Sequence, residues 1–108
     1  MTADPWWIAM VTIERLNRDQ EILPDWALGA CGWVAALAPD EDAARKRIEA
    51  DMSAVGLRLM DVEDLQPVVD ADEVSGVDEH LAANMRTLKA GRRTAWGELF
   101  CYAAEGEA

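Results

Sequence analysis

The fold is decided between residues 28 and 56, where the chain reads LGACGWVAALAPDEDAARKRIEADMSAVG. Residues 28–38 form a continuous apolar run, rich in glycine and alanine, which predicts a strand buried on both faces. Their small side chains leave room for a helix or another backbone to come close. Residues 39–56 carry the start signal, the periodicity and the end signal of a helix. This stretch therefore predicts a strand followed directly by a helix.

The predicted helix starts behind Pro39 and Asp40, and its first turn is acidic. Asp40 has the side chain of an N-cap, and carboxylates suit the positive end of a helix dipole. Apolar residues then recur at steps of four, four and three, and they form the stripe Ala44, Ile48, Met52 and Val55. Gly56 follows where a left-handed C-cap residue belongs.

Further strands are predicted on both sides of this unit. Residues 6–14 are dense in apolar and β-branched side chains, and residues 15–25 are a polar connection that suits a wide hairpin loop. Residues 57–65 predict a strand whose alternation is imperfect, as expected of a strand that is bulged or buried on both faces. Residues 94–103 predict the closing strand.

A second helix is predicted to start near Ser75, because Ser75 and Asp78 have the spacing of a capping box. Its apolar stripe repeats the steps of the first, at Val77, Leu81, Met85 and Leu88. Gly91 offers a C-cap. Lys89, Arg92 and Arg93 gather near this end, where cations suit the helix dipole, and the alternative is that Arg92 and Arg93 hold an anion.

The expected fold class is α+β, because strands and helices alternate in the order β β α β α β. Both stripes are one-sided, so we expect a two-layer sandwich with two helices on one face of a four- to five-stranded, mostly antiparallel sheet. A short strand at residues 67–74 would give residues 28–103 the ferredoxin-like order, with residues 6–14 as an extra strand. The 108 residues are expected to form a single domain, residues 1–108, because a chain of this length can bury one core.

The chain is acidic, with 10 Lys and Arg against 21 Asp and Glu and a formal net charge of −11. Such a charge disfavours nucleic acid and anionic membranes as partners and leaves a basic protein open. Residues 61–79 contain no base, and residues 80–97 contain no acid, so the two patches can pair within the fold or between two copies. The predicted acidic surface consists of Asp61, Glu63, Asp64, Asp70, Asp72 and Glu73. The alternative is a solvated loop around a helix N-terminus.

The candidate binding site is one face of the last strand. Alternation places Trp96, Glu98, Phe100 and Tyr102 on a large aromatic face, opposite a face of small side chains. If both helices cover the small face, the aromatic face stays open, and monomers rarely leave a large apolar patch bare. Three arrangements would account for an open aromatic face. It packs against the sheet of a second copy in a homodimer, it is covered by residues 15–27 with Trp26, or it lines a ligand cleft.

Motifs for catalysis or metal binding are not found in the sequence. His80 is the single histidine and has no cysteine beside it, which argues against a zinc site. Cys31 and Cys101 fall in predicted strands among small apolar residues, where a thiol behaves as a small hydrophobe. The acidic stretch at residues 70–75 lacks the ligand pattern of an EF-hand. We expect no cofactor and no metal.

These observations predict a small acidic module that binds protein or associates with itself, and not an enzyme. Homodimerisation is the use expected of the aromatic face, and a basic protein is the partner expected of the acidic run. The alternative is a small-molecule binder or enzyme in which aromatics hold a ligand and Glu98 or His80 handles a proton. The start carries Asp4 and Pro5 without a basic segment, and no apolar run reaches transmembrane length, so a cytoplasmic location is expected.

Overall fold

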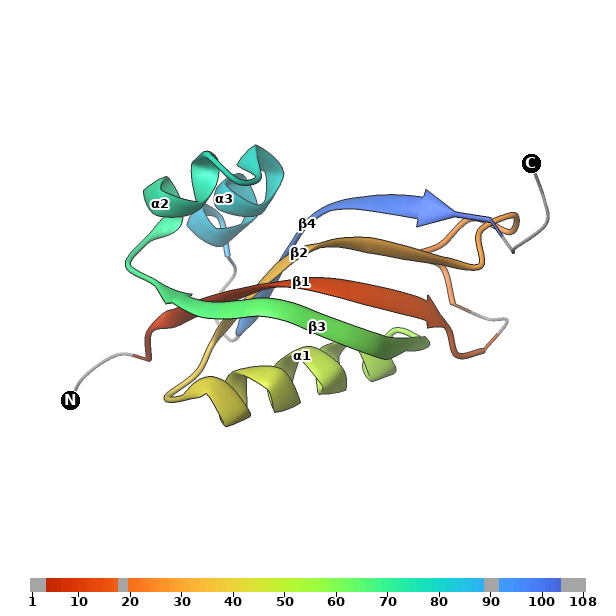
Figure 1. Cartoon of the computed structure of the whole chain (residues 1–108), viewed down its shortest axis with the longest axis horizontal. Helices are drawn as coiled ribbons and strands as arrows, with labels where there is room; N and C mark the ends of the chain where they lie inside the picture. Colours follow the sequence, from red (N-terminus) through yellow and green to blue (C-terminus); the bar gives the residue numbers. More distant parts are fainter. Residues whose placement is uncertain (1–3, 18–19, 89–91, 104–108) are drawn as a thin grey trace.

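The structure is a computed structural model that describes residues 4–17, 20–88 and 92–103 (Figure 1). Its elements are β1 (Trp6–Arg15), β2 (Gly29–Leu37), α1 (Glu41–Ala54), β3 (Leu57–Val68), α2 (Ala71–Ser75), α3 (Glu79–Arg86) and β4 (Thr94–Tyr102). The four strands form one antiparallel sheet of order β3-β1-β2-β4. The α+β class is confirmed. Within the described residues, no helix is long and apolar enough to cross a membrane.

The helix α1 forms as its sequence predicts. The carboxylate of Asp40 accepts a hydrogen bond from the backbone N–H of Ala43 at 2.8 Å, which caps the first turn. Ile48 and Met52 are buried against the sheet. The helix ends at Ala54 with Val55 as its C-cap, and Gly56 follows with a φ of +82°, in the left-handed region that side chains rarely adopt.

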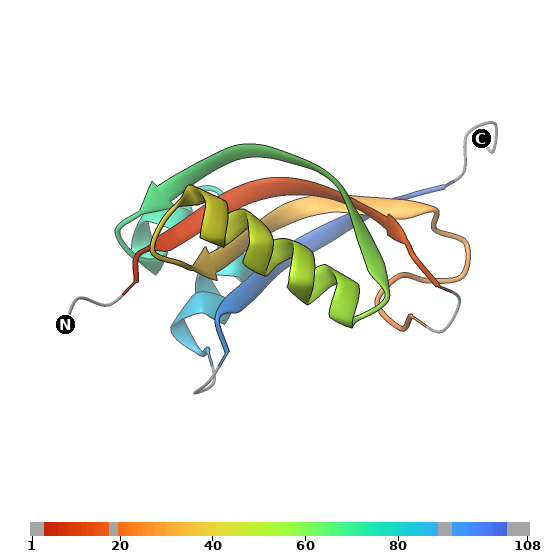
Figure 2. The ribbon, with the colours of Figure 1, turned by 90° about the horizontal axis from the view of Figure 1, so that it is seen from below.

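The helices lie on opposite faces of the sheet (Figures 1 and 2). Ile48 of α1 shares a buried cluster with Val11 of β1. Leu81 of α3 shares a separate cluster with Ile8, on the other side of the same strand. The expected two-layer sandwich, with both helices on one face, is therefore wrong. An apolar stripe determines which side of a helix is turned toward the sheet. It does not determine on which of the two faces of the sheet the helix packs.

The strand predicted at residues 67–74 is also wrong, because β3 ends at Val68 and α2 follows. The backbone N–H of Glu73 donates to the Asp70 carboxylate at 3.1 Å, while the Glu73 carboxylate accepts from the N–H of Val69 at 2.6 Å. Glu73 accepts from the residue before the N-cap Asp70, so the pair is a shifted form of the capping box. It starts a helix where a strand was expected. Residues 28–103 consequently lack the ferredoxin-like strand order, and β1, expected as an extra strand, lies inside the sheet.

The second predicted helix is divided, with Ser75 as the last residue of α2. Asp78 is the N-cap of α3, and its carboxylate accepts from the N–H of Leu81 at 3.0 Å. The helix ends at Arg86, so neither Arg92 nor Arg93 lies in its last turn. The predicted C-cap at residue 91 and the lysine at residue 89 lie outside the described residues.

Imperfect alternation in β3 has its cause in two register shifts against β1. One shift falls between Ile8 and Met10, and the other falls between Thr12 and Ile13. Asp64 has a φ of +55°, in the left-handed region, beside the first shift. The bulged form of this strand is thus confirmed, and β3 forms one edge of the sheet.

Candidate interaction surface

Part of the sheet has no helix over it. Figure 1 shows α1 running below the sheet, whereas α2 and α3 lie above one end only. Around Ile8, Ala35 and Ala95 the upper face is covered by these two helices. Beyond that end, the same face continues without a helix. We call this region the open face, and it comprises Met10, Thr12, Glu14, Cys31, Glu98, Phe100 and Tyr102. Trp33 borders it and packs against the cluster under α2 and α3. On β3, Asp61 and Glu63 pair with Thr12 and Met10 and so lie on the same side of the sheet.

The side chain of Phe100 is the most exposed apolar group of the open face, at 60%. It stands opposite Cys31 in the register of β2 and β4. Its neighbours Leu99 and Cys101 point to the other side, where they pack against the α1 cluster. The sequence-predicted separation of small and aromatic side chains in β4 is therefore correct from Glu98 onward.

Trp96 does not belong to the open face, although the sequence places it there. A register shift between Gly32 and Val34 inserts an extra β4 residue opposite Trp33. This bulge turns Trp96 toward α1, where its indole N–H donates to the Asp51 carboxylate at 2.6 Å. Strict alternation across residues 96–102 is thus wrong, because a bulge breaks the period of two.

Glu98 and His80 meet at the border between the open face and α3. The His80 Nε2 atom lies 3.9 Å from the Glu98 carboxylate, and both side chains are mostly exposed. The backbone N–H of Glu98 donates to the Asp78 carboxylate at 3.2 Å, which ties β4 to the start of α3. Both side chains of this pair are therefore open to solvent.

Tyr102 closes the other end of the open face. Its phenol donates to the Glu14 carboxylate over a distance of 3.5 Å. Partial burial raises the pKa of the Tyr102 phenol above its ordinary value of about 10, and the neighbouring Glu14 carboxylate raises it further. The raised pKa keeps Tyr102 neutral in the folded chain, and that contribution to stability is present below about pH 10 and is lost as the pH rises through the folded value.

Changing Glu14 to glutamine should lower the pKa of Tyr102 while leaving it above the ordinary value, because the effect of burial remains. The chain contains a single tyrosine, so the ultraviolet absorbance of phenolate reports this residue alone. Glu98→Gln is the matched control, since Glu98 does not contact the phenol, and it should leave the titration unchanged. A Tyr102 pKa that is the same in wild type and Glu14→Gln would contradict the pairing.

The predicted acidic surface is divided between two elements. Asp61, Glu63 and Asp64 lie exposed on the edge strand β3. Charged side chains on an edge strand hinder pairing with other strands. Asp70 and Glu73 instead form the capping box of α2.

Asp72 makes an ion pair with Arg86, which joins the acidic run to the basic one that follows it. Pairing of the two patches within one copy is therefore observed. The three β3 carboxylates have no ion-pair partner among the described residues.

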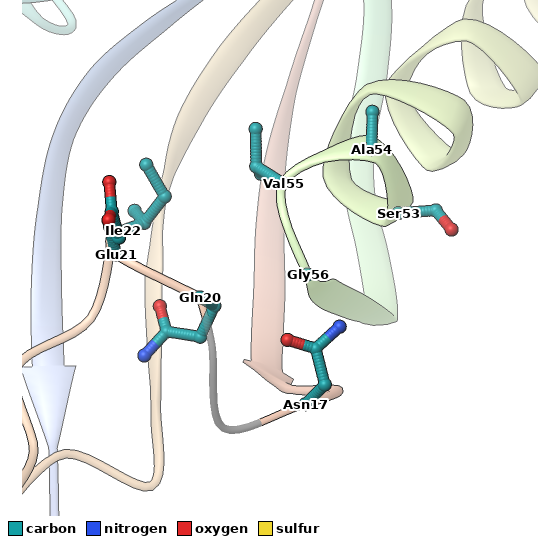
Figure 3. Close-up of a pocket in the computed structure, with 8 residues that line it drawn as sticks. All are labelled: Asn17, Gln20, Glu21, Ile22, Ser53, Ala54, Val55 and Gly56. Carbon is teal, nitrogen blue, oxygen red and sulfur yellow. The ribbon is translucent and has the colours of Figure 1, made fainter.

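The segment before β2 packs beside α1 and leaves the open face uncovered. Its Leu23 and Ala27 are buried in the α1 cluster, while Trp26 is 61% exposed. Coverage of the open face through Trp26 is therefore wrong. Figure 3 shows residues 20–22 across a pocket of about 360 Å³ from the end of α1. Glu21 is the single charged residue among its described lining, which does not assemble a reactive group.

Other reactive side chains remain dispersed. Both cysteines are free and half-buried, with Cys31 on the open face and Cys101 on the α1 side. Within the described part of the chain, no three His, Cys, Asp or Glu residues gather closely enough to hold a metal. The pairing of Asp51 with Trp96 was missed by sequence reasoning, because it depends on a bulge that no residue pattern indicated.

The open face, the exposed carboxylates of β3 and the bulge at Trp96 are thus the distinctive features of the described surface. No protein-family model, curated protein or solved structure matches this chain in the comparisons.

Proposed function

We propose that this chain is a non-enzymatic protein-binding module that forms a homodimer through its open face. The observation that carries the proposal is Phe100, which is 60% exposed on a sheet surface without a covering helix. Met10 and Tyr102 lie on the same face, and Trp33 borders it where the α3 cluster begins. Exposed apolar patches of this kind mark interaction sites.

A second copy of the chain fits the shape of the molecule. The extents are 49 × 26 × 23 Å, and the second helical layer covers one end of the long axis (Figure 1). A two-fold axis through the open faces would stack the uncovered ends and leave each α2–α3 layer outside the contact.

The small-molecule alternative is less well supported. It required Trp96, Phe100 and Tyr102 to line one cleft, with Glu98 or His80 handling a proton. Trp96 lies on the opposite side of the sheet, and the Glu98–His80 pair is exposed to solvent. The remaining aromatic groups lie on a sheet surface, which favours contact with another protein.

Sedimentation equilibrium tests the proposal. The chain of 11.9 kDa should sediment as a dimer, and Phe100→Ser should weaken dimerisation by about 2–4 kcal/mol because each dimer loses two central aromatic contacts. Val69→Ser is the matched control, since Val69 is 86% exposed and lies away from the open face, next to α2. A wild-type monomer at all concentrations, or equal loss of dimer in both variants, would refute the proposal.

A basic protein bound at Asp61, Glu63 and Asp64 is a second use that we propose for the chain, and salt separates it from self-association. Two copies with a net charge of −11 repel each other, so the homodimer should tighten as ionic strength rises. A complex with a basic partner should instead weaken. A homodimer that dissociates steeply with added salt would show that charge pairing, and not the aromatic surface, holds it together.

A further inference from the structure

A groove at the β4 edge of the sheet is formed between the two helical layers. It is separate from the open face. One part is a pocket of about 430 Å³. It is lined by Asp51 of α1 and its C-cap Val55, by Asn84 and Leu88 from the α3 side, and by Trp96 of β4. Its volume lies within the range of about 300–1,000 Å³ that is usual for small-molecule sites.

The aromatic wall of this groove is held in place. The Trp96 indole N–H donates to Asp51 at 2.6 Å, so the ring is fixed between the sheet edge and α1. Asn84 donates its side-chain amide to the backbone carbonyl of Trp96 at 2.5 Å, which fastens α3 to the same residue. A ring that is already fixed loses little conformational entropy when a flat ligand packs on it.

The other part of the groove is basic. A second pocket, of about 390 Å³, shares Asp51, Arg92 and Thr94 with the first and adds Arg47 and Arg93. Three of the ten basic side chains of this acidic chain therefore line a single groove.

Two of the three arginines are already engaged. Arg47 and Arg93 lie 3.4 and 3.5 Å from the carboxylate of Asp4. Arg92 is exposed and has no ion-pair partner among the described residues. Because α3 ends at Arg86, capping of that helix does not account for Arg92.

We propose that this groove binds a small aromatic carboxylate. Its ring would pack on Trp96, Val55 and Leu88, and its carboxylate would receive the paired N–H groups of Arg92. The charged side chains at the groove are the arginines Arg47, Arg92 and Arg93 and the aspartates Asp4 and Asp51. Three positive and two negative charges leave one net positive charge, which suits a ligand with a single anionic group.

Titration with naphthoate, followed by nuclear magnetic resonance of the Trp96 indole N–H, tests this assignment. Millimolar naphthoate should shift the Trp96 signal, which Trp96→Phe identifies by its loss. Acetate, which lacks the ring, and naphthylmethanol, which lacks the charge, should each bind about ten-fold more weakly or worse. An unchanged Trp96 signal at millimolar naphthoate would overturn the proposal.

Arg92→Gln provides the charge test, and Arg58→Gln, at an exposed arginine of the opposite edge strand, is its matched control. The first variant should bind naphthoate about ten-fold more weakly with naphthylmethanol unaffected, and the second should bind both as wild type does. Equal weakening by both variants would show a general charge effect and would overturn the role of Arg92. Unchanged spectra elsewhere establish that each variant is folded.

Discussion

Replacing Ile48 by alanine will lower the free energy of unfolding by about 2–5 kcal/mol, because a buried side chain is removed and its cavity cannot fully collapse. Ile48 is 1% exposed and packs in the cluster that joins α1 to β1 and β2. Domains of this size have a total stability of about 5–15 kcal/mol, so this one substitution removes a large share. Urea denaturation followed by circular dichroism measures the loss.

The matched control is Glu49→Ala, at the exposed neighbour of Ile48 in the same helix. It should change the free energy of unfolding by less than about 0.5 kcal/mol, because exposed substitutions away from caps have small effects. Similar losses at both positions would contradict the placement of the α1 stripe against the sheet. A loss of stability in Glu49→Ala alone would mean that the opposite side of the helix faces the sheet.

Replacing Gly29 by alanine will destabilise the fold by about 3 kcal/mol or more, because the added methyl group overpacks a rigid position. A Cβ atom on Gly29 would lie 2.3 Å from the backbone carbonyl oxygen of Ile13 and 2.5 Å from the Tyr102 hydroxyl. Relief requires β1 to move away from β2 and the Tyr102 ring to move as well, out of its contact with Glu14. Gly29→Ala should therefore both lower the denaturation midpoint and change the pKa of Tyr102.

Gly76→Ala is the comparison for this prediction, since nothing lies within 4 Å of a Cβ built there. Gly76 has a φ of −74°, which alanine adopts without strain. Alanine at residue 76 should be neutral or should stabilise the chain by about 0.4–1 kcal/mol through the unfolded state. Equal tolerance of alanine at Gly29 and Gly76 would contradict the close approach of strands and tyrosine at Gly29.

Local features of this fold were predictable where neighbouring residues carry the signal. Asp40, the stripe around Ile48 and the left-handed Gly56 define α1 within one short stretch. The structure agrees with each of them, except that the C-cap itself is Val55 and Gly56 is the residue after it. The strands β1, β2 and β4 also agree closely with their predicted ranges. In these segments, propensity, periodicity and capping all favour the same element.

The errors arose where distant contacts decide the outcome. Which face α3 covers depends on the path of its connections, and the sequence pattern of the stripe is identical for either face. Trp96 changes side because of a bulge opposite Trp33, and no residue type in β4 marks that position. Asp70 and Glu73 have the spacing of a capping box, which indicates the start of a helix. The prediction of a strand at residues 67–74 did not use this signal.

The groove was the least predictable feature. Asp51 lies between apolar-stripe residues on α1, and the sequence gives no reason to connect it with Trp96, 45 positions away. The sequence allows two roles for Arg92, binding an anion or placing a positive charge at the end of the second helix. Because α3 ends at Arg86, the second role is excluded.

The reactivity of the two free thiols tests self-association through the open face most directly, because they lie on opposite sides of the sheet. Alkylation of the wild-type chain, followed by peptide mass spectrometry at low and high protein concentration, gives a rate for each thiol. We predict that Cys31, opposite Phe100, reacts more slowly as concentration rises, while the rate of Cys101 stays constant. A Cys31 rate that does not change with concentration, or protection of Cys101 alone, would contradict dimerisation through this face.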